Sequence, residues 1–127
     1  MALLTLVGCA SSNAYAPPTT TDIAAAEEAV AAAKKSGAAQ GEPSARYVQV
    51  AEEQLVNGKQ LAQQGDNRNA VWSLARAAAD GELAYALNRQ MRAESDARRL
   101  ERQLAETRRE SVTRPPVDSE QPPSAPQ

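Results

Sequence analysis

The fold is decided by residues 44–87, which have the sequence SARYVQVAEEQLVNGKQLAQQGDNRNAVWSLARAAADGELAYAL. Apolar side chains recur at helical spacing in both halves of this stretch, on either side of Gly65-Asp66-Asn67. Gly65 can adopt the left-handed conformation that ends one helix, and Asp66 can cap the next. Because so short a connection makes neighbouring helices antiparallel, the stretch predicts an antiparallel helical hairpin that turns at Gly65 and Asp66.

The first arm of the hairpin is predicted to begin at Pro43-Ser44 and to end at about Gln64. Its apolar stripe consists of Tyr47, Val48, Ala51, Leu55, Val56, Leu61 and Ala62. Gly58 lies inside the helix, where glycine costs about 1 kcal/mol relative to alanine. It indicates either a close helix crossing or a tolerated exposed glycine.

The second arm carries two neighbouring lines of apolar and small residues. They are Val71, Leu74, Ala78, Gly81 and Tyr85 on one line, and Trp72, Ala75, Ala79 and Leu83 on the other. Two lines can face two helices, so one helix besides the first arm is expected to pack here. Trp72 is expected to contribute the largest buried area.

This additional helix is expected upstream of the hairpin, from Thr21 or Asp22 to Ser36-Gly37. Its apolar stripe of Ile23, Ala26, Val30 and Ala33 is mostly alanine and therefore marginal in water without a partner. The sequence thus predicts an all-α protein, a small three-helix bundle with alanine and glycine at its contacts.

From Asn88 onward charged residues dominate, yet no helix breaker occurs before Pro115. The third helix is therefore expected to continue to about residue 110 as a solvated, charged extension, with pairs such as Glu94 and Arg98 at helical spacing. Met91, Leu100 and Leu104 are the candidate face for a partner or a second copy. The pattern is shorter than the roughly 3 to 4 heptads of an established coiled coil, so a coiled coil stays one alternative.

The single cysteine, Cys9, follows a short apolar run. Leu6-Val7-Gly8-Cys9 resembles a bacterial lipobox, and that resemblance implies cleavage before Cys9 and acylation of its thiol and new amino group. Residues 1–8 would be the end of a signal peptide. No Lys or Arg precedes the apolar run, and the run is shorter than the roughly 7 to 15 residues of the apolar core of an ordinary signal peptide. The true start of the protein is therefore expected upstream. The alternative is a frayed terminus with an incidental thiol.

The segments that flank the helices have the composition of spacers. Residues 9–21, with Pro17-Pro18, are expected to tether an acylated Cys9 to the helical domain at 22–110, and residues 111–127, with several prolines, to form a disordered tail. Nothing approaches the roughly 20 apolar residues that span a bilayer. By resemblance to lipoproteins of Gram-negative bacteria, Ala10-Ser11 after the cysteine favours the outer membrane, facing the periplasm.

The composition argues against several classes of function. A formal net charge of −2, with acids interleaved among the arginines, does not favour nucleic acid as a partner. With no histidine and one cysteine, the chain has too few ligands for a His/Cys metal site, and no cofactor motif is present. The adjacent carboxylates Glu27-Glu28 and Glu52-Glu53 diverge by about 100° on a helix, so an enzyme is not expected.

Several short motifs resemble a family of small bacterial lipoproteins, the domain of unknown function 4398. The similar positions are Asp22, Ala26, Ala29, Gly37-Ala38, Pro43, Ala51, Leu55, Gly65-Asp66, Ala70 and Leu74-Ala75. The resemblance covers about residues 22–91. It implies an envelope location and a helical fold but supplies no catalytic residues.

Together these features predict a non-catalytic lipoprotein that acts as a scaffold or adaptor in the cell envelope. Its partners would be the membrane, through the lipid anchor, and an envelope protein. One alternative is a structural protein that forms homo-oligomers through Met91, Leu100 and Leu104. Another is a cytosolic helical interaction protein, if no signal is encoded upstream.

Overall fold

The computed structural model describes residues 15–113 and confirms an all-helical bundle. Its elements are α1 (Thr20–Ser36), the short 3-10 helix η1 (Ala38–Gln40), α2 (Ser44–Gln63) and α3 (Asn67–Thr113), and no strand occurs within this range. By its internal contacts the chain divides into two compact units, Met1–Gln90 and Met91–Gln127, which are described separately. The predicted signal segment 1–8 and most of the predicted tether and tail lie outside the described residues.

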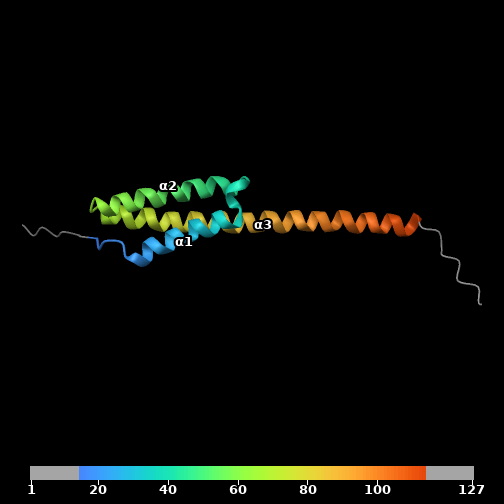
Figure 1. The fold of residues 1–127 in the computed structure, drawn as a ribbon, viewed down its shortest axis with the longest axis horizontal. Coiled ribbons are helices and arrows are strands. Elements are labelled where there is room, and N and C mark those ends of the chain that lie inside the picture. The colour runs from blue at the N-terminus through green and yellow to red at the C-terminus, as the bar shows by residue number, and fades with distance from the viewer. Residues whose placement is uncertain (1–14, 114–127) are drawn as a thin grey trace, which may run out of the picture. The chain divides into compact units, whose positions relative to one another are not determined.

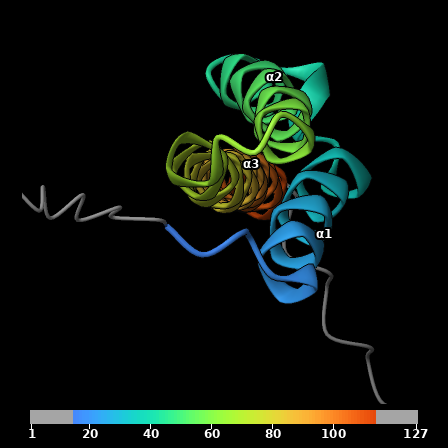
Figure 2. The ribbon, with the colours of Figure 1, turned by 90° about the vertical axis from the view of Figure 1, so that its left-hand side faces the viewer.

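In the first unit, α1, α2 and the first half of α3 lie beside one another and run in alternating directions (Figure 1). Viewed along the helices, the three form a triangle, with α1 and α2 on one side of α3 (Figure 2). The hairpin is the one predicted. Gly65 has a left-handed φ of 78°, and an Asp66 carboxylate oxygen accepts from the Asn69 backbone N–H at 3.4 Å.

The start of α1 is set by a capping box two residues before the predicted position. Thr19 Oγ1 accepts from the Asp22 backbone N–H at 3.2 Å, and Asp22 Oδ2 accepts from the Thr19 backbone N–H at 2.7 Å. The expectation of a cap at Thr21 or Asp22 is therefore wrong, since Asp22 occupies the third helical position. The predicted stop is confirmed by Gly37, whose φ is 87°.

The core consists of small side chains. One cluster joins Ala33, Ala38, Val48 and Ala84, and another joins Ala26, Leu74 and Ala77. Leu74 and Ser44 are the largest fully buried residues, and the Ser44 hydroxyl lies within hydrogen-bond distance of the Ala38 and Gly41 carbonyl oxygens, at 2.8 and 2.7 Å. Because little apolar area is available per residue, stability depends on close helix approach.

Two glycines make that approach possible. A Cβ added at Gly58 would lie 2.8 Å from Cγ of Leu74, and one added at Gly81 would lie 2.9 Å from the backbone carbonyl carbon of Ala29. The first distance confirms the close-crossing interpretation of Gly58. The second shows that α1 crosses α3 almost backbone to backbone.

The prediction for Trp72 is wrong. Its side chain is 62% exposed, and Ala75, Ala79 and Leu83 on the same line are also exposed. Both neighbouring helices instead share one face of α3, and this face consists of Ala70, Ser73, Leu74, Ala77, Gly81, Ala84 and Asn88. Trp72 lies about 180° from Gly81 around the helix, so its side chain is on the side of α3 away from this face.

Asn88 marks a second correction, because it does not begin the solvated extension. It is 7% exposed, and its Nδ2 donates to the Ser36 carbonyl oxygen at 2.8 Å. Ser36 is the last residue of α1, so Asn88 satisfies a carbonyl that the helix end leaves without a partner. The packed part of α3 therefore reaches Asn88.

In the second unit, the described residues are the last turns of α3, from Met91 to Thr113. The helix extends three residues beyond the predicted end at 110. All of its side chains are exposed except that of Met91, which is partly buried. The predicted pair Glu94 and Arg98 is confirmed at 3.6 Å, and Arg99 lies 3.1 Å from Asp96. No described helix combines the length and apolar character needed to cross a membrane.

Candidate functional site

The predicted lipidation site cannot be placed geometrically. Cys9 and the lipobox residues Leu6, Val7 and Gly8 lie outside the described residues. The described chain begins at Tyr15, six residues after Cys9. Acylation of Cys9 therefore stays a prediction from the sequence.

The residues predicted to form the partner face do not share one line of the helix. A helix turns about 100° per residue, so Leu100 and Leu104 lie within about 40° of each other, whereas Met91 lies about 180° from Leu100. Leu100 is 55% exposed and Leu104 is 69% exposed. The candidate face in the second unit therefore reduces to Leu100 and Leu104.

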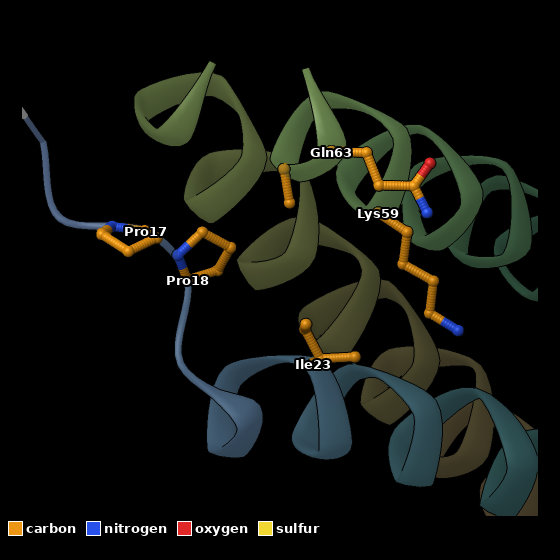
Figure 3. A pocket seen from close by; sticks show the side chains of 6 residues that line it. Pro17, Pro18, Ile23, Lys59 and Gln63 are labelled. Atoms are coloured by element: carbon orange, nitrogen blue, oxygen red, sulfur yellow. The ribbon is translucent and has the colours of Figure 1, made fainter. Parts of the chain in front are cut away.

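The first unit has a groove where the segment before α1 passes the end of α2 (Figure 3). It has a volume of about 440 Å³ and is lined by Pro17, Pro18, Ile23, Lys59, Ala62 and Gln63. Pro18 and Ile23 supply apolar walls, and Lys59 and Gln63 supply polar groups from α2. The Lys59 ammonium is already paired with Glu27. The one ionisable side chain in this lining is therefore engaged in an ion pair.

The titratable groups of the described residues fit structural roles. Hydrogen bonds from the Thr19 side chain and backbone lower the pKa of Asp22 below its ordinary value of 3.8. Lys34 and Glu52 form an exposed ion pair between α1 and α2, as Lys59 and Glu27 do. Among residues 15–113, no three His, Cys, Asp or Glu side chains gather as a metal site would require.

A further surface feature was missed from the sequence. Four residues compose it, and we call them the aromatic corner: Tyr15, Arg68, Trp72 and Arg76. Asn67 Nδ2 donates to the Tyr15 carbonyl oxygen at 3.0 Å, and the Arg68 guanidinium lies 5.6 Å from the centre of the Tyr15 ring. These two contacts hold the segment before α1 against the first turn of α3.

Within the described chain, neither arginine of the corner forms an ion pair. Arg68, Trp72 and Arg76 follow one another at intervals of four, so they lie along one side of α3. This interval was the available sequence signal. The position of Tyr15 could not be predicted from the sequence, because it depends on a contact between residues that are 52 positions apart.

Comparisons of the chain with family models, with curated proteins and with solved structures found no match. The resemblance to the domain of unknown function 4398 accordingly stays a prediction from the residues quoted above.

Proposed function

We propose that the protein is a lipid-anchored scaffold or adaptor of the bacterial cell envelope, without catalytic activity. The observation that carries the proposal is the lipobox-like sequence Leu6-Val7-Gly8-Cys9. Acylation of Cys9 would supply the membrane attachment. Ala10-Ser11 after the cysteine favours the outer membrane, with the helices in the periplasm.

The second unit supplies a surface suited to a protein partner. Leu100 and Leu104 expose apolar area on a helix whose other side chains are mainly charged. An amphipathic helix of this kind can place its apolar stripe in a groove of another protein or against another helix. The charged flanks would then set orientation rather than affinity.

The adaptor role can be tested by cross-linking in the native host. A chain without residues 91–127 keeps every buried residue of the first unit, Asn88 included, so the bundle should stay folded while cross-linked partners are lost. A full chain with Leu100→Ser and Leu104→Ser should lose the same partners, and Arg92→Ser with Arg99→Ser is the matched control that should keep them. Retention of all partners in the truncated chain would contradict the proposal.

Self-association is a second candidate, favoured by the same two exposed leucines. In that case the partner of the face is another copy, as in a two-stranded coiled coil. Analytical ultracentrifugation separates the candidates, because a self-associating chain gives a sedimentation coefficient that rises with concentration. A chain that is monomeric at all concentrations would contradict self-association, and the adaptor role would then be the one candidate left.

A further inference from the structure

We infer that the aromatic corner of Tyr15, Arg68, Trp72 and Arg76 docks on the headgroup layer of an anionic phospholipid membrane. The inference rests on the proposed function, since it takes Cys9 as the anchor. It adds a second, protein-mediated contact with the same membrane. The corner would fix the orientation of the first unit against the lipid surface.

Chain length places the corner near any membrane that holds Cys9. Tyr15 follows Cys9 by six residues, and an extended chain spans at most about 3.6 Å per residue, so Tyr15 stays within about 22 Å of the acylated cysteine. Tyr15 is in turn held to the first turn of α3 by its contacts with Asn67 and Arg68. The corner is therefore among the described surfaces closest to the anchor.

The side chains of the corner suit a lipid interface. Trp72 is 62% exposed and Tyr15 is 49% exposed. Tryptophan and tyrosine have an apolar body and a polar end, which favours the boundary between headgroups and acyl chains. Exposure of the chain's single tryptophan at this position has no role in the packing of the bundle.

The charges of the corner complement phosphate groups. Arg68 and Arg76 flank Trp72 one helical turn away on either side, and no described carboxylate pairs with them. The nearby carboxylate of Asp66 is directed at Asn69, which it caps. Each arginine near an anionic lipid surface adds attraction, so two together favour binding.

The same charges disfavour a second copy of the corner as its occupant. Two corners face to face would bring four unpaired guanidinium groups together, and like charges in contact oppose association. Trp72 lies on the side of α3 opposite its buried face, and α1 and α2 both lie on one side of α3 (Figure 2). A flat anionic surface can approach the corner without rearrangement of the bundle.

The test uses the full chain from Cys9 onward, coupled through its single thiol to a maleimide lipid in vesicles. Trp72 is the only tryptophan, so its emission reports on the corner directly. On vesicles of phosphatidylglycerol and phosphatidylethanolamine, its emission should shift to shorter wavelength and its quenching by acrylamide should fall, relative to the uncoupled chain. Arg68→Gln with Arg76→Gln should reduce the ratio of docked to undocked protein by about 30-fold.

The matched control is Arg108→Gln with Arg109→Gln, which removes the same charge from the second unit and should leave the Trp72 signal unchanged. Emission and quenching equal to those of the uncoupled chain would overturn the inference, as would equal effects of the two double variants. A concentration-dependent shift without vesicles would assign the corner to a second copy instead.

The docking of the corner and the acylation of Cys9 are tested independently, because coupling to the maleimide lipid replaces acylation in the vesicle experiment. A mature chain from the host with an unmodified Cys9 would remove the proposed function, whatever Trp72 does on vesicles. An acylated Cys9 with a Trp72 that stays in water would keep the anchor and remove the docking.

Discussion

Residues 67–90 and 91–113 belong to the same helix, α3, but they are helical for different reasons. All seven buried residues of α3 lie in the first stretch, whereas the second has none. The first stretch is stabilised by tertiary packing, and the second by its own propensity and by side-chain pairs such as Glu94–Arg98, each worth a few tenths of a kcal/mol. One helix therefore joins a packed segment to a segment that is free to bind.

Truncation of one leucine in each stretch should give the largest difference in stability. Leu74 is 1% exposed, so Leu74→Ala should lower the free energy of unfolding by about 2–5 kcal/mol. Leu104 is 69% exposed, so Leu104→Ala should change it by less than about 0.5 kcal/mol. Urea unfolding followed by circular dichroism measures both, and equal effects would mean that the second stretch is packed as well.

A Cβ at the closest crossing tests whether the first stretch depends on small residues. Gly81→Ala should lower the free energy of unfolding by about 1–3 kcal/mol, although alanine is the better helix former, because its Cβ would meet the Ala29 backbone at 2.9 Å. Gly41→Ala is the control, since nothing lies within 4 Å of its added Cβ. A Gly81→Ala protein as stable as the wild type would show that the crossing can relax.

Asn88 tests where the packed stretch ends. Asn88→Ala leaves the partly buried Ser36 carbonyl without its donor and should lower the free energy of unfolding by about 1–3 kcal/mol. Thermal melting should show this as a fall in Tm, while the exposed control Ser95→Ala should leave Tm in place. Equal Tm values for the two variants would mean that the packed stretch of α3 ends before Asn88.

The smallest expected effect concerns the start of α1. Because its folded pKa is lowered below 3.8, Asp22 contributes stability that is complete above pH 3.8 and is lost as the pH falls through the folded pKa. Asp22→Ala should therefore lower Tm at neutral pH, and the difference from wild type should narrow as the pH falls below 3.8. A Tm difference that stays constant with pH would show that the carboxylate charge has no part in the cap.

The end of α1 and the turn between α2 and α3 could be predicted because they depend on local chemistry, whereas the start of α1 was predicted at the wrong residue. Gly65 adopts the left-handed conformation that the sequence predicted for it, Gly37 ends α1 at the predicted position, and Asp66 caps the next helix. These residues act through their own backbone or a neighbour three positions away. The long third helix was likewise predicted from the absence of a helix breaker before Pro115.

Burial on α3 could not be predicted from hydrophobicity. Trp72 was expected inside because it is large and apolar, and Asn88 outside because it is polar. The structure reverses both, since both neighbouring helices pack on the face of α3 opposite Trp72 and the end of α1 requires a donor. Both causes lie in the position of another helix, as does the contact of Tyr15 with Arg68 that creates the aromatic corner.

Mass spectrometry of the protein from its own host is the direct test of the proposal that this bundle is held at a membrane through Cys9. The gene should be expressed with its full upstream reading frame, as wild type and as Cys9→Ala. We expect the wild type to have a mature N-terminus at Cys9 that carries acyl chains, and we expect the variant to lack it. An unmodified chain that retains Met1 in the soluble fraction would contradict it.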